Sequence, residues 1–205
     1  MTGNIGIFWR KIVRRGFGFL GASKQMRMIY TVEDPWNMAS EREQDRFSET
    51  NAKIMEEVGA HFDTIMELGC GEGHQTIHLL ELADRAYSLD ISEAAVERAR
   101  RRCPEVKFEA TSVEESYKLF PDIHFDLITA CEVLYYVNNL DDVLPLLQTR
   151  TRHIFVTMFR PLADKMRHHL TGKGWRRLDD MTTADKREFE CFLWTEDPAE
   201  TMQQN

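Results

Sequence analysis

The sequence predicts an α/β protein with a doubly wound, mostly parallel sheet. From residue 51 onward, short apolar runs rich in β-branched residues alternate with amphipathic stretches of helical period. This alternation is typical of parallel strands joined by crossover helices. A stretch with three glycines in five residues follows the first apolar run, at the place where doubly wound proteins bind their ligands. The 205 residues, 42% of them hydrophobic, are enough for one sizeable core.

The predicted elements follow one another without repeats. Strands are expected at residues 63–69, 85–90, 106–110, 125–131 and 153–159, and helices near residues 47–58, 73–83, 92–102, 113–119, 141–149 and 160–170. Pro145 falls inside one of these helices, so a late start or a kink is expected there. Near the C-terminus, Phe189, Cys191 and Leu193 alternate with acidic residues. That pattern predicts an antiparallel edge strand, paired with a strand around residues 175–180.

The first 30 residues differ in charge from the rest of the chain. They contain six basic residues and no acidic residue, although the whole chain has a net charge of −8. Within residues 4–20, apolar side chains such as Phe8, Trp9 and Ile12 recur every three or four positions among the basic ones. The spacing indicates a basic amphipathic helix. Such a helix suits peripheral contact with an anionic membrane or contact with a protein surface, and the sequence leaves both open.

Composition argues against several classes of protein. A net charge of −8 disfavours a general nucleic-acid binder, because phosphate neutralisation needs a basic face. The four cysteines lack the spacing of zinc ligands or of a disulfide framework, so we expect no metal and a reducing compartment. No apolar run of about 18 residues occurs that would suggest a membrane span. We expect a cytoplasmic protein, with peripheral contact at the inner face of the membrane as an open alternative.

The stretch "ELGCGEG" places its glycines directly after the first predicted strand. Gly69 and Gly71 permit a tight turn and a close approach of the backbone to a ligand. The helix that follows directs its free N–H groups toward the same place. Dinucleotide enzymes carry the spacing G-x-G-x-x-G instead. A nicotinamide oxidoreductase is therefore the disfavoured alternative.

The second predicted strand ends in Asp90, within "AYSLDIS". An acidic residue at about this distance after the glycine loop accepts hydrogen bonds from a ribose diol. Ile91, the next residue, is placed to press against one face of a purine. We therefore expect a ligand with a ribose and an adenine, whereas the glycine spacing fits a pyrophosphate poorly.

"ELGCGEG" followed by "LDIS" resembles the S-adenosylmethionine site of class I methyltransferases, which share a Rossmann-like fold. "FDLITACEVLYYV" (Phe125 to Val137) resembles the fourth strand of that family, and "VEDPWNMASEREQDRF" (Val32 to Phe47) resembles the DPW segment of the nodulation protein S group. Members of that group N-methylate an amine of a chitooligosaccharide. The resemblance spans residues 33–159. It implies S-adenosylmethionine as cofactor, S-adenosylhomocysteine as product, and a small-molecule or oligosaccharide acceptor.

The same resemblance assigns roles to individual residues. Gly69 and Gly71 are expected beside the methionine part of the cofactor, Glu67 beneath the loop, and Asp90 at the ribose. The expected cofactor residues are Trp36, Glu67, Gly69, Cys70, Gly71, Asp90, Ile91, Ser112, Val113 and Cys131. One departure concerns the adenine: many relatives have an acidic residue where this chain has Ser112, with Glu114 displaced by two positions. A second is the linker before the fifth strand, which lacks the usual Pro-Gly turn.

Methyl transfer is an in-line displacement, so the enzyme must hold an unprotonated nucleophile behind the methyl group and exclude water. Glu132 and Tyr135, after the fourth strand, are expected to face the acceptor, and His74 is a candidate base. Each has an alternative: a cofactor contact or a loop-ordering hydrogen bond for Glu132, core packing for Tyr135, and a solvent-facing position for His74. Trp36 is expected either as a lid over the cofactor or as a packing anchor.

These observations divide the chain into four parts. They are a basic amphipathic extension at residues 1–30, a DPW lid segment with a leading helix at 31–60, an S-adenosylmethionine-binding methyltransferase domain at 61–198, and a flexible tail at 199–205. The expected activity is methyl transfer to an N or O nucleophile of a small or medium polar acceptor such as a saccharide or glycolipid precursor. The alternative is a catalytically silent methyltransferase-like subunit that binds a partner.

Overall fold

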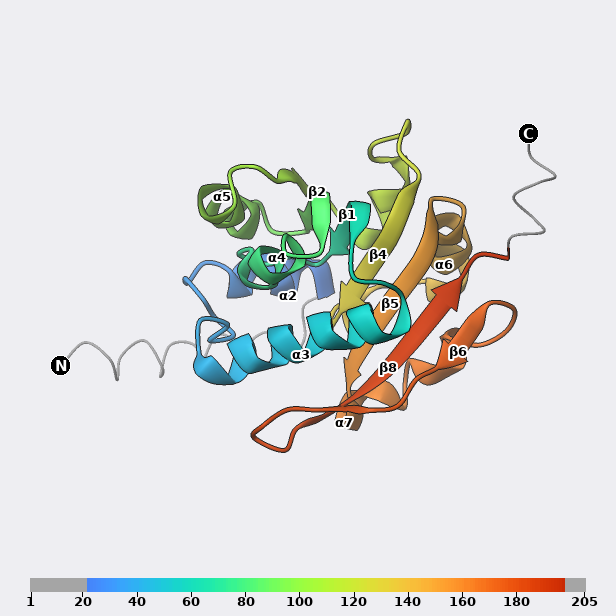
Figure 1. The fold of residues 1–205 in the computed structure, drawn as a ribbon. Coiled ribbons are helices and arrows are strands. Elements are labelled where there is room, and N and C mark those ends of the chain that lie inside the picture. Colours follow the sequence, from blue (N-terminus) through green and yellow to red (C-terminus); the bar gives the residue numbers. More distant parts are fainter. Residues whose placement is uncertain (1–21, 198–205) are drawn as a thin grey trace.

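A mixed sheet of eight strands forms the centre of the computed structural model, which describes residues 22–197 (Figure 1). The strand order is β3-β2-β1-β4-β5-β8-β6, and β7 pairs with β8. The parallel strands are β1 (Phe62–Leu68), β2 (Ala83–Asp90), β3 (Lys107–Ala110), β4 (Phe125–Cys131) and β5 (Thr151–Phe159). The antiparallel strands are β6 (Trp175–Arg177), β7 (Met181–Thr182) and β8 (Glu188–Thr195). The predicted doubly wound, mostly parallel class is confirmed.

Helices cover both faces of the sheet. The helices α3 (Glu41–Glu57), α4 (His74–Leu79) and α5 (Glu93–Arg102) lie on one face, and α6 (Leu140–Gln148) lies on the other (Figure 1). Side chains alternate along β1, so Ile65 packs in one core cluster with Ile54 of α3, while Met66 packs in the other with Leu144 of α6. One hydrophobic layer therefore lies on each face of the sheet.

Several predicted helices have different bounds or a different type. The helix predicted at residues 47–58 begins at Glu41, after Ser40 in the N-cap position and with acidic residues in its first turn. The segment at 113–119 is a 3-10 helix, η1 (Val113–Lys118). The helix predicted at 160–170 is split into α7 (Arg160–Ala163) and η3 (Arg167–His169). Pro145 lies inside α6, which begins at Leu140 and continues past the proline.

The antiparallel edge is present, but β6 and β7 form it rather than β8. The strand β8 pairs with β5 on one side and with β6 and β7 on the other. Its alternating sequence suggested one solvated face, yet Glu190 in its middle is 1% exposed. Arg167 donates a hydrogen bond to this carboxylate over 2.8 Å. Glu190 is therefore a buried carboxylate paired with an arginine, at a position where an alternating sequence ordinarily indicates a solvent-exposed side chain.

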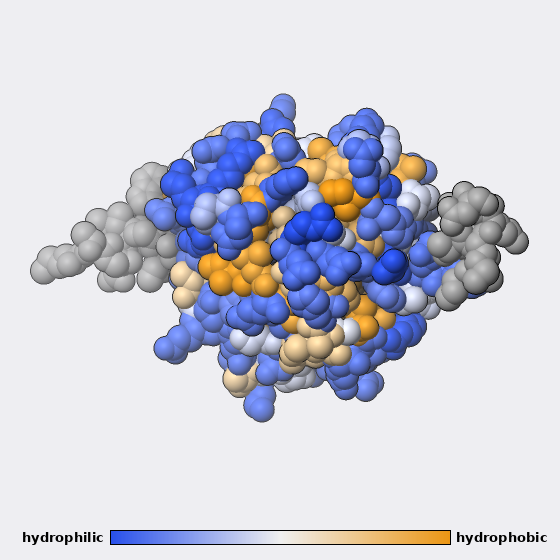
Figure 2. Space-filling model, turned by 45° about the horizontal axis from the view of Figure 1, so that its top comes forward, coloured by the Kyte–Doolittle hydropathy of each residue, from blue (hydrophilic) through white to orange (hydrophobic). Residues whose placement is uncertain are grey.

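The amphipathic helix predicted at residues 4–20 and the tail at 199–205 lie outside the described residues. Within residues 22–197, no helix is long and apolar enough to cross a membrane. On the face shown in Figure 2, hydrophobic residues form separate patches among hydrophilic ones.

Candidate functional site

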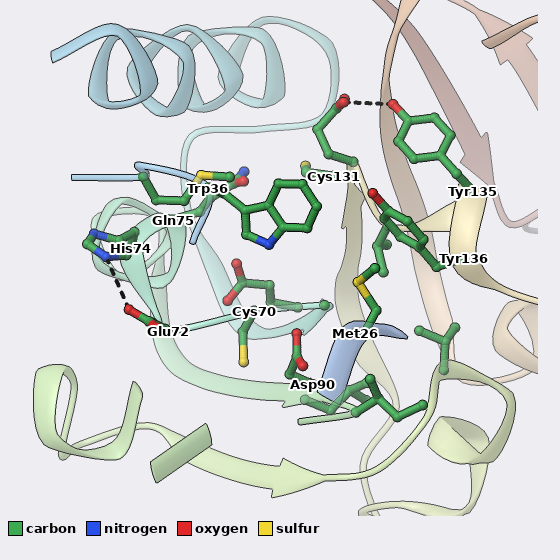
Figure 3. Close-up of a pocket in the computed structure, with 18 of the residues that line it drawn as sticks. Met26, Trp36, Cys70, Glu72, His74, Gln75, Asp90, Cys131, Tyr135 and Tyr136 are labelled. Carbon is green, nitrogen blue, oxygen red and sulfur yellow. Dashed lines mark hydrogen bonds and ion pairs between the residues drawn. The ribbon is translucent and has the colours of Figure 1, made fainter. Parts of the chain in front are cut away.

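A cavity of about 410 Å³ opens where the carboxyl ends of the parallel strands meet. The strand order reverses between β1 and β4 at this point, and open α/β sheets bind ligands at such a reversal. The lining residues come from α2 (Ala22–Ile29) and the DPW segment, from α3, and from the loops after β1, β2, β3, β4 and β5. The turn before β8 completes the mouth. Figure 3 shows the side chains that extend into this space.

The glycine loop after β1 is crowded on both sides. Gly69 has a φ of 76°, and a Cβ atom there would lie 2.5 Å from Val133 Cγ2. Gly71 has a φ of 54°, and a Cβ atom there would lie 2.7 Å from the Tyr30 hydroxyl. The N–H groups of Gly69 and Cys70 donate to the Leu89 carbonyl, which ties the loop to β2. Only glycine combines this backbone conformation with these contacts.

Asp90 faces the loop from the end of β2. Its Oδ2 accepts a hydrogen bond from the Gly71 N–H over 3.0 Å, and its Oδ1 accepts one from the Ser92 N–H over 2.9 Å. Burial raises the pKa of Asp90 to about 6, and the backbone hydrogen bonds oppose that rise. A carboxylate has about four acceptor positions. Two therefore remain for the hydroxyl groups of a ribose, and the chemistry of the site fits that group.

Glu67 lies beneath the loop, at the end of β1. Its Oε2 accepts hydrogen bonds from the Thr76 hydroxyl over 2.6 Å and from the Ser88 hydroxyl over 3.1 Å. Both partners hold the carboxyl group in one orientation beside the cavity. Burial raises the pKa of Glu67 to about 7, and the charge of Asp90 adds to that rise. The pKa values of both carboxyl groups beside the glycine loop therefore lie above their usual range.

Three residues before the sheet cover the cavity, and the sequence identified one of them, Trp36. Met26 of α2 packs with Ile29 in a small apolar cluster that Trp36, Ile91 and Tyr136 complete. In Figure 3 the Trp36 ring extends into the cavity between Asp90 and Cys131. Tyr30, which the sequence analysis did not select, is buried against the glycine loop.

The segment that carries these residues is fixed by Arg98 of α5. The Arg98 guanidinium donates to the carbonyl oxygens of Tyr30 and Val32 over 3.1 and 3.2 Å. It also donates to Glu72 Oε1 over 2.7 Å, and the same oxygen accepts the Asp34 N–H over 2.9 Å. One buried carboxylate and one arginine therefore hold the DPW segment in the cavity wall.

The residues expected at the adenine also line the cavity. Ile91, Ser112 and Val113 all lie in its wall. Glu114, the displaced acidic residue, accepts a hydrogen bond from the Asn138 N–H over 3.0 Å. The Glu114 carboxylate is therefore engaged with the loop after β4. Of these two residues, Ser112 is the one that lies nearer along the chain to the end of β3.

Glu132 and Tyr135 bridge the ends of β4 and β5. The Tyr135 hydroxyl donates to Glu132 Oε2 over 2.6 Å (Figure 3). The N–H of Phe159 donates to the same carboxylate over 3.1 Å. Burial raises the pKa of Glu132 and, together with the neighbouring carboxylate, raises the pKa of Tyr135. Both residues line the cavity. The phenol is thus held as a donor, and the loop-ordering hydrogen bond considered for Glu132 is present.

His74 and Cys70 are buried and Cys131 is half-buried, and each of them has a shifted pKa. His74 is 8% exposed, and its Nε2 lies 3.9 Å from Glu72 Oε2. Burial and the charge of Arg102 lower the pKa of His74, which favours the neutral imidazole. Burial raises the pKa of the Cys131 thiol to about 11 and that of Cys70 well above its usual range. His74 is therefore not the solvent-facing residue that was its alternative.

The helix α3 contributes polar residues that the sequence analysis missed. Glu43 and Arg46 both lie in the cavity wall and are 4% and 3% exposed. The Arg46 Nε donates to Glu43 Oε2 over 2.8 Å, and Arg187 from the turn before β8 donates to Glu43 Oε1 over 2.9 Å. A signal was present, since these residues share the i, i+3, i+4 face of α3 with Phe47 and Ile54. Charged residues on the buried face of a helix are a signal for a functional site.

The mouth of the cavity on this side is partly apolar. Phe159, Leu162 and Phe189 line it together with Arg42 and Arg187. The two phenylalanine rings lie 5.6 Å apart between centroids, and Leu162 is 44% exposed. Within residues 22–197, no group of His, Cys, Asp or Glu side chains is arranged to hold a metal ion.

The glycine loop and Asp90 lie in a stretch of the chain that is similar to a known family. A methyltransferase domain model matches residues 65–153. Nodulation protein S of Sinorhizobium fredii is 31% identical over 132 residues, which cover 63% of this chain and 57% of that protein. Malonyl-[acyl-carrier protein] O-methyltransferase of Halorhodospira halophila is 28% identical over 129 residues, which cover 62% of this chain and 43% of that protein. The chain spans about half the length of these curated relatives.

A solved structure supports the same assignment at the level of the fold. The N-methyltransferase NodS from Bradyrhizobium japonicum, in complex with S-adenosyl-L-homocysteine, superposes with a TM-score of 0.71 at 17% identity. The superposition covers 87% of this chain and 100% of that chain. Residues 65–153 therefore match a methyltransferase domain model, the described residues share the fold of this N-methyltransferase, and the chain is similar to the nodulation protein S group.

Proposed function

We propose that the protein transfers a methyl group from S-adenosylmethionine to an N or O nucleophile of a small or medium polar acceptor. The observation that carries this proposal is the pairing of the glycine loop with Asp90, whose carboxylate holds Gly71 and keeps acceptor positions for a ribose diol. S-adenosylmethionine supplies the activated methyl group when bound. The chain itself contributes binding, orientation and exclusion of water.

The cofactor is assigned to the wall formed by β1, β2 and β3. In this proposal Asp90 binds the ribose, Gly69 and Gly71 allow the methionine part to approach the backbone, and Glu67 accepts from the ammonium group. Ile91, Ser112 and Val113 flank the adenine, while Cys70 and Cys131 provide uncharged walls. Trp36 and the unpredicted Tyr30 cover the cofactor from the DPW side.

The acceptor is assigned to the side of β4 and β5. Glu132 is an acceptor for an N–H or O–H of the incoming nucleophile, and Tyr135 positions that carboxylate through its 2.6 Å hydrogen bond. In Figure 3 His74 lies beside Glu72 and away from Tyr135, and its Nε2 is 3.9 Å from Glu72 Oε2, so we assign it to the cofactor side. The resemblance to nodulation protein S supports a saccharide or glycolipid precursor as the acceptor.

Calorimetric titration with S-adenosylhomocysteine, with NAD as the comparison ligand, tests the cofactor assignment. We expect binding of the former alone, and we expect Asp90→Ala to weaken it by roughly 2–4 kcal/mol, because the variant removes a charged hydrogen-bond partner from a buried site. Unchanged affinity in the variant would remove the ribose assignment. Binding without methyl transfer to any amino sugar or glycan would favour a catalytically silent subunit.

The basic segment at residues 4–20 is proposed as a peripheral contact, on the strength of its sequence pattern alone. Its aromatic residues and arginines suit the anionic surface at the inner face of a membrane. Deletion of residues 1–22 is expected to abolish sedimentation with vesicles that contain anionic lipid and to leave the circular dichroism spectrum unchanged. Retained sedimentation would exclude this contact, and a change in oligomeric state instead would indicate a subunit contact.

A further inference from the structure

Apolar side chains border Glu132 at the mouth of the cavity. They belong to Phe159, Leu162 and Phe189, which we call the apolar strip. Phe189 is 2% exposed, and its ring lies 5.6 Å from the ring of Phe159, which is half-buried. Leu162 is 44% exposed. The strip therefore has a packed base at Phe189 and an accessible end at Leu162.

The short helix α7 holds Leu162 at this place. Pro161 lies in its first turn, where the fixed backbone angle of proline suits a helix start, and Ala163 is fully buried in the core. Single exposed leucines are ordinary on protein surfaces. Leu162 differs because it lines a cavity together with two aromatic rings. A ligand that covers it gains hydrophobic free energy that the fold leaves unused.

The apolar strip adjoins the polar group that is assigned to the nucleophile. The N–H of Phe159 donates to Glu132 Oε2 over 3.1 Å, so the residue that holds this carboxylate also carries one ring of the strip. The Tyr135 hydroxyl donates to the same oxygen over 2.6 Å. Ligand sites combine a mostly apolar wall with a few placed polar groups. The carboxylate and the strip are such a combination.

We propose that the acceptor is amphiphilic. An alkyl or aryl group close to the nucleophile covers the apolar strip, while an N–H or O–H of the nucleophile donates to Glu132. This inference rests on the proposed function and narrows its acceptor to a polar molecule that carries an apolar group. It makes Leu162 a residue that determines specificity, because a wholly hydrophilic acceptor would leave this side chain in water.

A second hollow beside the mouth gives the apolar group room to extend. It has a volume of about 340 Å³ and shares Phe159 and Arg187 with the cavity. The rest of its lining is formed by Arg160, Pro161, Lys186 and Glu188. Arginine and lysine place their aliphatic stems against apolar groups while their charged ends reach water. A chain that begins near Glu132 can therefore continue past Phe159 into this hollow.

Two amino sugars that differ only in their alkyl group test the inference. Octyl and methyl glycosides of glucosamine are titrated calorimetrically into the protein saturated with S-adenosylhomocysteine, the octyl compound below its critical micelle concentration. We expect the octyl glycoside to bind at least about tenfold more tightly, because several methylene groups leave water. Leu162→Gln should reduce this preference at least about threefold and leave the affinity for the methyl glycoside within about twofold. Leu162→Met should keep the preference.

Leu146 of α6 provides a matched control. It is 38% exposed and lines neither the cavity nor the second hollow, so Leu146→Gln should keep the wild-type preference. An exposed leucine can also belong to a contact between two copies of the chain, and sedimentation equilibrium of Leu162→Gln should show the wild-type oligomeric state. A changed oligomeric state, equal binding of the two glycosides or binding of neither overturns the inference. Failure of the wild-type protein to bind S-adenosylhomocysteine overturns the proposed function itself.

Discussion

Gly69 and Gly172 both have a positive φ, but only Gly69 is crowded by neighbouring atoms. Comparing them separates the backbone cost of adding a side chain from the cost of a steric clash. Gly69 has a φ of 76° and would place a Cβ atom 2.5 Å from Val133. Gly172 has a φ of 95° and nothing within 4 Å of such an atom. The difference between the two alanine variants therefore measures the packing of the loop against the end of β4.

We expect Gly172→Ala to lower the free energy of unfolding by roughly 1–2 kcal/mol, the cost of a left-handed conformation for a residue with a Cβ. Gly69→Ala should lose at least about 2 kcal/mol more, because the clash adds to the same backbone cost. Urea denaturation of the two variants checks this. Equal losses would mean that Val133 moves aside freely and that the loop is not tightly packed.

At the residue scale, the sequence identified groups whose relation is set by short stretches of chain. Gly69, Gly71 and Asp90 could be predicted because a strand, a turn and the next strand fix their relative positions. Tyr30 could not, because its place in the wall depends on how the segment before the sheet docks on it. A loop-ordering hydrogen bond was one alternative for Glu132, but Tyr135 was not predicted as its donor. The binding roles of all these residues stay predictions.

At the scale of elements, α5 does more than cover the sheet. Arg98 on its cavity side donates to the carbonyl groups of Tyr30 and Val32, so this helix holds the segment that carries Trp36. Arg101 lies three positions further along the same helix and is exposed. The two arginines form a matched pair for testing what that contact contributes.

Arg98→Met is expected to raise the hydrogen-exchange rates of amides in residues 30–38 at least tenfold, since it removes hydrogen bonds that hold the segment closed and leaves Glu72 with one partner fewer. Arg101→Met should leave those rates unchanged. Exchange measured by mass spectrometry on both variants decides the point. Equal rates in both would show that the segment is held by the packing of Met26 and Tyr30 alone.

The elements also show where local sequence is insufficient. The five parallel strands were predicted within two residues at each end, because buried apolar runs bounded by polar turns are distinctive. The helix expected at residues 160–170 is not continuous, because Arg167 forms a hydrogen bond with Glu190 of β8. This tertiary contact overrides local helix propensity. The same ion pair, in which Glu190 is buried and Arg167 is partly exposed, hid the interior position of β8, since an acidic residue in an alternating pattern ordinarily indicates solvent.

For the molecule as a whole, the buried acids link stability to pH. Burial raises the pKa of Glu67 to about 7 and that of Asp90 to about 6 in the folded protein, from 4.5 and 3.8. At pH values between the unfolded and the folded pKa of each group, the folded state binds more protons than the unfolded state. This contribution to stability is therefore complete below about pH 4 and is lost as the pH rises toward 7.

We expect the free energy of unfolding of the wild-type protein to fall more between pH 5 and pH 7.5 than that of Glu67→Gln, because the amide removes the largest of these shifts. Urea denaturation at both pH values for the two proteins gives the comparison. Parallel pH profiles would mean that Glu67 is ionised as readily in the folded protein as in the unfolded one.

The order of the strands also sets the order in which the site can be completed during synthesis. Asp45 of α3 accepts the N–H of Ala184 over 2.9 Å, and Glu43 accepts from Arg187, so an early helix and the last turn before β8 share the mouth of the cavity. Domains form as their chain emerges, N-terminal parts first. The wall built by β1, β2 and β3 is available long before β8 has left the ribosome. On a growing chain, the half assigned to the cofactor can therefore assemble first, while the entrance assigned to the acceptor waits for the final strand.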